Sequence, residues 1–291
     1  MGFFRNKFKS KPFQPYGRTN IGIVGLGLIG GSVAKALAAN MKGANIVGVD
    51  PDQSTLDFCM KEHIINFGHR ELNILRGCEV IFICTPIETV SDMISKVYAA
   101  VGDGAVITDV AGVKRQIFSS LPKGIRFVSG HPMSGSEKSG FENSDGALME
   151  KCTYILIREK ETAAADFDRV KGIIGAFTDK IIETDAETHD RSTAAVSHML
   201  HVMAYALCNR VLPDGDAAAV VGRCFKDMTR IAQNQPPLWV NTCRFNSKAV
   251  CEQIEEYTGE LNFVKAMIEN KEWDKLQAYF ERGRELRLCR N

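Results

Sequence analysis

Residues 20 to about 185 alternate short apolar runs with amphipathic stretches, and this alternation constrains the fold more than any other feature. The runs "IGIVG" and "VIFICTP" are apolar on both faces, as strands inside a parallel sheet must be. Seven strands are expected, at 21–25, 45–50, 80–86, 105–110, 125–130, 153–157 and 180–185. Helix-like segments such as "GSVAKALAANM" lie between most of them, so the pattern predicts parallel βαβ units in a doubly wound α/β sheet.

The strand pattern stops after residue 185, and the rest of the chain has a helical character. The segment 189–212 carries Ala, Met, Leu and Val around most of its circumference in its later turns. Such a helix needs burial on several sides, which predicts an all-α domain completed by a second subunit as a homodimer. We therefore expect a basic arm at 1–19, an α/β domain at 20–185 and a helical dimerisation domain at 186–291.

Composition excludes several classes of function. The formal net charge is +1, which gives no reason to expect a nucleic-acid partner. No run of about 18 apolar residues exists, so no membrane-spanning helix is expected. The nine cysteines are scattered without a CxxC pair, which favours reduced thiols in a cytoplasmic protein and argues against a metal site. The arm at 1–19 has five basic and no acidic residues, and it is interpreted as mobile or as packing on a partner subunit.

The segment "GLGLIGGS" has the G-x-G-x-x-G spacing of a dinucleotide-binding turn, between a predicted strand and a predicted helix. Gly25 permits the tight turn, Gly27 lets the backbone approach a pyrophosphate, and Gly30 lets the helix pack closely. Leu28 and Ile29 complete the turn at the helix N-terminus, which favours phosphate. The context predicts a Rossmann-type domain.

Asp50 ends the next strand, 20 residues after Gly30, where an acidic side chain binds the adenosine ribose. Its charge would repel a 2′-phosphate, so NAD is favoured over NADP. Alternatively Asp50 caps the following helix, although Asp52 or Ser54 could do so.

Thr85 and Pro86 end the strand "VIFICTP", at the sheet edge where ligands of doubly wound proteins bind. Both are expected to lie beside the cofactor, which is compatible with a simple strand stop at Pro86.

His131 lies in "SGHPMSGSEKSG" (129–140), on a loop expected to follow the fifth strand. A polar surface turn is one interpretation. The other is an active-site loop, because an alcohol dehydrogenase needs a group that accepts the hydroxyl proton near neutral pH.

The helical part carries further candidates. His198 and His201 are three residues apart on one helix face, where they could contact an anionic substrate. A core histidine is the alternative for either residue. Arg230 follows Arg223 and Lys226 on a helix expected to be half-buried, where an arginine can bind a carboxylate with two hydrogen bonds.

Together these motifs resemble the prephenate/arogenate dehydrogenase family of tyrosine biosynthesis. The resemblance covers about residues 20 to 250 through "GLGLIGGS", "ICTP", "TDVAGVK", "GHPMSGSEKSG", "THD", "SHMLH", "KDMTRIA" and "PPLW". It implies a nucleotide domain, a dimerising helical domain and an active site between them. It also implies NAD-dependent oxidative decarboxylation of prephenate to 4-hydroxyphenylpyruvate.

The resemblance also implies roles for individual residues. His131 would accept the proton of the C4 hydroxyl, Arg230 would hold a substrate carboxylate and His201 would contact the substrate. Glu137 would help to order the loop, and Trp239 would form a wall of the site.

Three positions depart from the family pattern, namely Gly112, Lys226 and Asn241. Gly112 stands where the family often has a serine that binds the histidine or the substrate, and Ser134 or Ser136 is expected to replace that hydroxyl. Alternatives to prephenate oxidation are arogenate oxidation, a 3-hydroxyacid-type dehydrogenase and a nucleotide-binding regulator with impaired catalysis.

Overall fold

The computed structural model describes residues 19–135 and 138–289. The chain forms two compact units. Unit 1 runs to Asp190 and also contains Gln233–Thr242, whereas unit 2 contains Arg191–Ala232 and the chain from Cys243 onward. The arm predicted at 1–19 lies outside the described residues except for Thr19.

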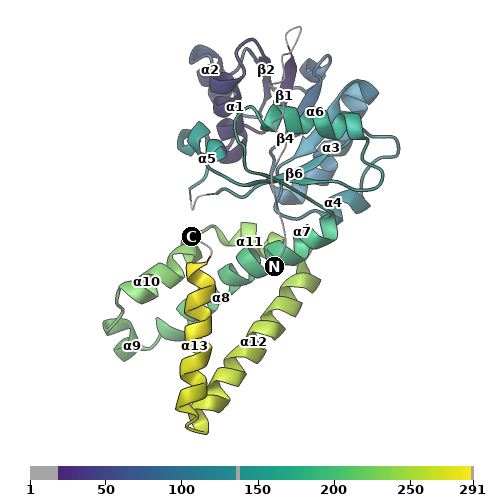
Figure 1. Ribbon diagram of the computed structural model, residues 1–291. Coiled ribbons are helices and arrows are strands. Elements are labelled where there is room, and N and C mark those ends of the chain that lie inside the picture. Colours follow the sequence, from purple (N-terminus) through teal and green to yellow (C-terminus); the bar gives the residue numbers. More distant parts are fainter. Residues whose placement is uncertain (1–18, 136–137, 290–291) are drawn as a thin grey trace. The chain divides into compact units, whose positions relative to one another are not determined.

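Unit 1 contains a five-stranded parallel sheet in the order β3-β2-β1-β4-β5, flanked by helices (Figure 1). Its strands are β1 (Asn20–Val24), β2 (Asn45–Val49), β3 (Phe67–His69), β4 (Val80–Ile83) and β5 (Val106–Asp109). The Rossmann-type α/β architecture is thus confirmed. The sequence analysis did not predict β3, a three-residue edge strand.

Two apolar cores, one on each face, hold this sheet. Along β4, Val80 and Phe82 belong to one core and Ile81 and Ile83 to the other, because successive side chains point to opposite faces. The helices α1 (Leu28–Asn40), α2 (Gln53–Lys61) and α6 (Ala164–Ile174) contribute to the first core. The helices α3 (Ile87–Val101) and α4 (Arg115–Ser119) contribute to the second.

The remaining strands form a second sheet in the order β6-β7-β8, and here the expectation of a single parallel sheet was wrong. Its strands are β6 (Ser129–Pro132), β7 (Tyr154–Ile157) and β8 (Ile181–Thr184). The strands β6 and β7 are antiparallel, and β7 and β8 are parallel. Residues 126–128 first bond to Ile107 of β5, after which the chain passes into β6. The predicted strand at 125–130 therefore belongs to two sheets.

Short helices complete unit 1. They are η1 (Leu72–Leu75), η2 (Gly102–Gly104), η3 (Phe141–Asn143), α5 (Gly146–Glu150), the first residues of α7 (Ala186–Thr193) and most of α11 (Pro236–Phe245).

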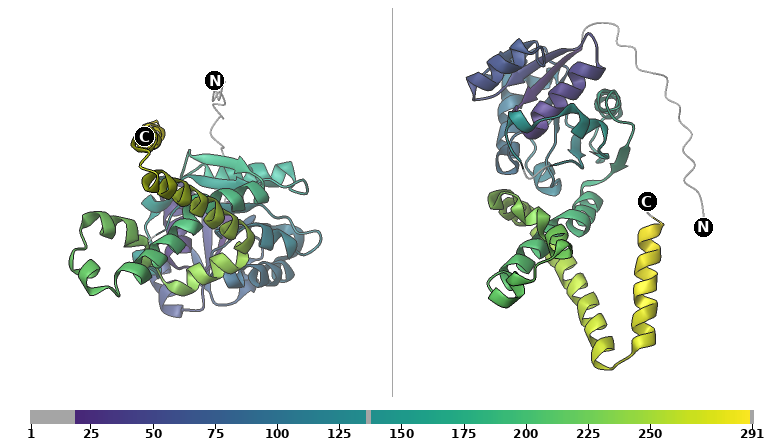
Figure 2. Two further views of the ribbon diagram at one scale, coloured as in Figure 1. Left: turned by 90° about the horizontal axis from the view of Figure 1, so that it is seen from below. Right: turned by 90° about the vertical axis from the view of Figure 1, so that its left-hand side faces the viewer.

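Unit 2 is helical. Its elements are the π-helix η4 (Ala194–His198), α8 (Met199–Val211), α9 (Gly215–Ala219), α10 (Arg223–Thr229), η5 (Arg230–Gln233), α12 (Ser247–Glu269) and α13 (Trp273–Leu288). The last two form a helical hairpin, seen at the right of Figure 2. Within this hairpin the Phe263 and Tyr279 rings pack edge to face at 6.0 Å.

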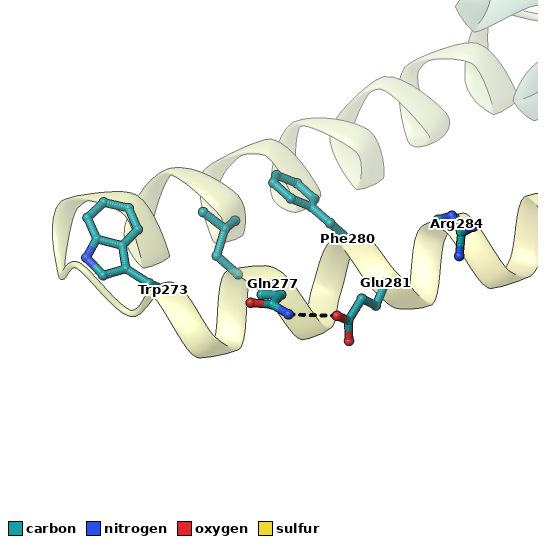
Figure 3. A pocket seen from close by; sticks show the side chains of 6 residues that line it. Trp273, Gln277, Phe280, Glu281 and Arg284 are labelled. Carbon is teal, nitrogen blue, oxygen red and sulfur yellow. Dashed lines mark hydrogen bonds between the residues drawn. The ribbon is translucent and has the colours of Figure 1, made fainter.

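The outer surface of α13 leaves large apolar side chains uncovered. Trp273, Leu276 and Phe280 line a recess of about 360 Å³, together with Gln277, Glu281 and Arg284 (Figure 3). Trp273 and Phe280 are each more than half exposed. No helix among the described residues is long and apolar enough to cross a membrane.

Candidate active site

The glycine-rich turn after β1 is built so that two of its glycines cannot carry a side chain. Gly25 has φ +90°, and a Cβ there would lie 2.9 Å from the Cys84 carbonyl oxygen. A Cβ on Gly30 would lie 1.8 Å from the Gly25 carbonyl oxygen, so α1 can approach the turn only with glycine at this position. A Cβ on Gly27 would meet nothing within 4 Å. Gly25 and Gly30 shape the turn, and Gly27 leaves open space beside it.

Asp50 is bonded to this turn. Its carboxylate accepts hydrogen bonds from the backbone N–H of Leu26 at 2.7 Å and of Asp52 at 2.9 Å. Asp52, not Asp50, caps α2, because its side chain accepts the N–H of Ser54 at 3.0 Å. The helix-cap alternative for Asp50 is therefore excluded.

The residues at this edge fit a bound dinucleotide. Leu28 and Ile29 form the first turn of α1, for which the described residues provide no side-chain cap and no acidic residue. The N–H groups of such a turn favour an anion. Pro86 precedes α3, and no described residue supplies a hydrogen-bond partner for the buried Thr85 Oγ1. A dinucleotide could fill the open space at Gly27. It could also supply hydrogen-bond partners for the uncapped N-terminus of α1 and for the Thr85 hydroxyl.

His131 lies within β6, where the backbone pairs with Ile155 of β7, and not on a loop after the fifth strand of the parallel sheet. Its Nδ1 is 2.9 Å from Nε2 of His189, and Nδ1 of His189 is 2.8 Å from Oδ1 of Asp190. His189 and Asp190 are buried, and His131 is partly exposed. Burial lowers the pKa of His189, and the charge of Lys114 lowers it further, against the opposing effect of Asp190.

A buried ion pair lies next to the two histidines. Lys114 Nζ donates to Asp109 Oδ2 and to the Gly130 carbonyl oxygen, both at 2.6 Å. Ser129 Oγ donates to Asp109 Oδ1 at 2.5 Å. Burial lowers the pKa of Lys114, and its attraction to Asp109 opposes this change. Through these hydrogen bonds the ion pair contacts Ser129 and Gly130, the two residues that precede His131 in β6.

Position 112 faces one edge of the His131 ring. A Cβ on Gly112 would lie 3.7 Å from both Cε1 and Nε2 of the imidazole. Ser134, the replacement hydroxyl expected from the sequence, is partly exposed and follows β6, with its N–H bonded to the Pro132 carbonyl oxygen at 2.7 Å. Ser136 and Glu137 lie outside the described residues.

Unit 2 places the predicted substrate histidines in different environments. His198 is buried, and its Nδ1 is 3.1 Å from the Asn246 side-chain nitrogen, which favours the alternative of a core histidine. His201 Nδ1 is 3.0 Å from the Ser197 carbonyl oxygen. Burial lowers the pKa of His201, and the nearby charge of Arg230 acts in the same direction.

Arg230 follows α10 and is exposed in the single chain, so the expectation of a half-buried arginine was wrong for the chain alone. Trp239 is partly buried on α11, in the segment that belongs to unit 1. The described residues contain no group of three or more His, Cys, Asp or Glu side chains that could hold a metal ion.

No roles were predicted from the sequence for Asp109, Lys114, His189 and Asp190. All four are in "TDVAGVK" and "THD", the motifs on which the family resemblance was based. Their proximity to His131 depends on tertiary contacts that local sequence patterns do not specify.

Comparison with known proteins gives this arrangement a family. Residues 33–183 match "Prephenate dehydrogenase, nucleotide-binding domain" and residues 185–282 match "Prephenate dehydrogenase, dimerization domain". The chain belongs to the prephenate dehydrogenase family. It is thus an oxidoreductase with a nucleotide-binding and a dimerisation domain.

Individual relatives agree with this assignment. The chain is 28% identical to the prephenate dehydrogenase of Bacillus subtilis over 277 residues, which are 91% of this chain and 74% of that protein. Its fold matches prephenate dehydrogenase from Aquifex aeolicus, solved with hydroxyphenyl propionate and NAD⁺, at TM-score 0.89 and 28% identity over 96% of this chain and 100% of the other. Synechocystis arogenate dehydrogenase matches at TM-score 0.81 and 26% identity, over 92% of this chain and 99% of the other.

Proposed function

We propose that this protein is an NAD-dependent prephenate dehydrogenase that converts prephenate to 4-hydroxyphenylpyruvate and CO2 in tyrosine biosynthesis. The observation that carries this proposal is the placement of His131. Its Nδ1 is held by His189, and its other edge faces the glycine at position 112, in the nucleotide-binding unit of a prephenate dehydrogenase fold. A partly exposed imidazole oriented in this way is suited to accept a hydroxyl proton.

The cofactor proposal rests on the turn around Gly25, Gly27 and Gly30. Bound NAD would supply the hydride acceptor. The N–H groups of Leu28 and Ile29 would bind its pyrophosphate, and Thr85 and Pro86 would lie along it. Asp50 has lone pairs left on both oxygens to accept the ribose hydroxyls, and its negative charge disfavours the 2′-phosphate of NADP.

The proposed reaction begins at the imidazole of His131. Its Nε2 takes the proton of the C4 hydroxyl while the hydrogen on C4 leaves as hydride. The C4–O bond thereby becomes a carbonyl. The bond between the ring and its carboxylate would then break and CO2 would depart. The electron pair would pass through the ring to the carbonyl oxygen, which takes up a proton to give the aromatic phenol. Aromatisation makes the decarboxylation favourable.

The remaining site residues are proposed from the family resemblance. Arg230 would bind a substrate carboxylate, with His201 as a further substrate contact and Trp239 as a wall. Ser134 and Ser136 complete the proposed substrate contacts, and Glu137 is proposed to order its loop. We also propose a cytoplasmic location, because all nine cysteines are free thiols.

Arogenate is the second candidate substrate, favoured by the likeness to the Synechocystis arogenate dehydrogenase. The two substrates differ at the side chain, where arogenate has an amino group and prephenate a ketone. Steady-state kcat/KM for both substrates, each with NAD and with NADP, separates the candidates. The proposal predicts the highest value for prephenate with NAD. Preference for arogenate with NADP would overturn both specificity assignments, and no turnover of either substrate would favour a regulator.

The variant His131→Asn tests the proton acceptor. We expect kcat to fall about 10²–10⁴-fold, the usual contribution of a positioned general base. NAD affinity, measured by calorimetry, should stay unchanged because His131 has no assigned contact with the cofactor. Turnover near the wild-type value would remove His131 from the mechanism.

A further inference from the structure

We propose that His189 and Asp190 are positioning residues that fix the tautomer of His131, so that Nε2 carries the lone pair that accepts the substrate proton. We call the chain of contacts from Asp190 through His189 to His131 the relay. The inference rests on the proposed function for its catalytic meaning. The tautomer itself is a property of the unliganded protein and can be measured separately.

The relay begins at Asp190, which acts as a hydrogen-bond acceptor. Its Oδ1 accepts the backbone N–H of Lys114 at 2.8 Å, and its Oδ2 accepts the backbone N–H of Arg115 at 2.9 Å. Backbone N–H groups can only donate, so both oxygens of Asp190 act as acceptors. Oδ1 also contacts Nδ1 of His189 at 2.8 Å. The proton in this contact therefore belongs to His189 Nδ1.

His189 transmits this polarity to His131. Its side chain is buried, and burial is the main cause that lowers its pKa, so the neutral ring is favoured at neutral pH. A neutral imidazole with its proton on Nδ1 has an acceptor at Nε2. This Nε2 is 2.9 Å from Nδ1 of His131, which must then be the donor. With Nδ1 protonated, the lone pair of neutral His131 lies on Nε2.

The same contacts also stabilise His131 after it has accepted the substrate proton. When His131 has taken a proton on Nε2, it is a cation with N–H groups at both nitrogens. Its Nδ1–H keeps its acceptor in His189, whose own N–H is bonded to the Asp190 carboxylate. An orienting carboxylate has this effect on the histidine of a Ser-His-Asp triad, and here one additional imidazole lies between the two groups.

The buried Lys114 is bonded near both ends of the relay. The Lys114 side chain donates to the carbonyl oxygen of Gly130, the residue before His131, and its backbone N–H donates to Asp190. These bonds fix the backbone beside His131 and the carboxylate of Asp190 relative to each other. The charged groups acting on His189 are Asp190, Lys114 and Asp109.

The Nε2 edge of His131 lies beside Gly112, which has no side chain. A Cβ on Gly112 would lie 3.7 Å from both Nε2 and Cε1, which is an ordinary contact distance. The relay thus directs the Nε2 lone pair toward the side of the ring on which Gly112 lies.

The direct test is the ¹⁵N NMR spectrum of the unliganded wild-type protein at pH 8, with the His131 signals assigned by their loss in His131→Asn. The proposal predicts protonated Nδ1 and unprotonated Nε2 on His131. A proton on Nε2 would overturn it. This measurement needs no turnover, so it distinguishes failure of the relay from failure of the proposed function.

Three variants add a kinetic test. His189→Leu removes the acceptor for His131 Nδ1, whereas His189→Gln offers an amide oxygen in its place. Asp190→Asn keeps the shape and removes the charge. We expect His189→Leu and Asp190→Asn to lower kcat/KM about 10²-fold. His189→Gln should retain about ten times the activity of His189→Leu.

The pH profile separates this role from simple structural support. In His189→Leu and Asp190→Asn, the acid limb of kcat/KM should move to lower pH, because protonated His131 has lost its acceptor chain, with NAD affinity unchanged. A fall in activity with an unshifted acid limb in His189→Leu and Asp190→Asn would overturn the proposal. Equal activity of His189→Gln and His189→Leu would do the same.

Discussion

The two units differ in how they bury their apolar side chains. In unit 1 the strands and the inner faces of the helices enclose two continuous cores, with side chains such as Ile21, Phe82 and Ile107 fully buried. In unit 2 the buried apolar residues are few, and larger side chains are exposed along α12 and α13, among them Phe263, Trp273, Phe280 and Leu286.

This difference indicates which unit can fold on its own. Most large apolar side chains of unit 1 are buried within one chain, whereas unit 2 leaves many of them exposed along its helices. Exposed apolar side chains gathered on one surface are typical of an interaction site. The match to a dimerisation domain at residues 185–282 explains these exposed side chains, because a second copy can cover them. Dimerisation therefore completes the core of unit 2.

The largest expected effect comes from placing charge on the exposed apolar surface of α13. The double variant Trp273→Asp/Phe280→Asp should raise the dimer dissociation constant about 10³–10⁶-fold. Each dimer then loses four half-exposed aromatic side chains, which contribute about 1–2 kcal/mol each. Analytical ultracentrifugation over a dilution series measures the change.

Phe67→Asp provides the matched control in unit 1. Phe67 on β3 is 56% exposed, the same fraction as Trp273, and it lies in the unit that closes its own core. Its variant should leave the dimer intact. Equal weakening by both variants would remove the distinction between the units.

The second largest effect is expected on the stability of unit 1, from a substitution in its glycine-rich turn. Gly30→Ala places a methyl group 1.8 Å from the Gly25 carbonyl oxygen, so α1 must move away from the turn. We expect a loss of about 3 kcal/mol or more in the free energy of unfolding of the protein without cofactor. Denaturant unfolding monitored by circular dichroism measures this loss.

Gly27→Ala is the control, because its methyl group meets nothing within 4 Å. This variant should unfold within about 1 kcal/mol of wild type, yet it should bind NAD more weakly because the methyl group fills the space proposed for the pyrophosphate. Unchanged NAD affinity in Gly27→Ala would contradict the placement of the cofactor.

A smaller effect is expected on the pH dependence of stability. Burial lowers the pKa of His189 in the folded protein below the ordinary value of about 6.5. Below about pH 6.5 the unfolded chain therefore binds a proton that the folded chain binds less readily. The free energy of unfolding falls as the pH decreases, and the contribution is fully present above that pH.

His189→Gln should flatten this dependence between pH 7 and pH 5, as followed by thermal unfolding. His201, whose pKa burial also lowers, keeps its own contribution in the variant. A slope identical to that of wild type would show that His189 does not stay neutral in the folded state.

The smallest effect is expected at position 112. Gly112→Ser introduces a side chain whose Cβ lies 3.7 Å from the His131 ring, which is an ordinary contact distance. We expect the free energy of unfolding to change by less than about 1 kcal/mol. The kcat should change by less than about tenfold. A larger loss would mean that the space beside Nε2 must stay open for this substrate.

The sequence predicted the parts of the molecule whose cause is local. Gly25, Gly30 and Asp50 belong to one short βαβ pattern, and their contacts lie within that pattern. The edge strand β3 was missed because Phe67 and His69 are exposed, so it lacks the apolar signal of a buried strand.

The parts that were not predicted depend on contacts between distant segments. Apolar periodicity shows that residues 125–130 are extended, but it does not show that their partner changes from β5 to β7. His189 lies in a polar stretch, and its partner His131 is 58 residues away. No local pattern distinguishes such a histidine from one on the surface.

The position of α7 has a consequence for protein engineering. The match to the nucleotide-binding domain ends at residue 183, whereas His189 and Asp190 lie beyond it, in the first helix of the segment matched by the dimerisation domain. A chimera of two relatives joined at residue 184 would take the proposed proton acceptor from one parent and the pair proposed to orient it from the other. Exchange of cofactor domains within this family should therefore place the junction after Asp190, so that the histidines remain a matched set.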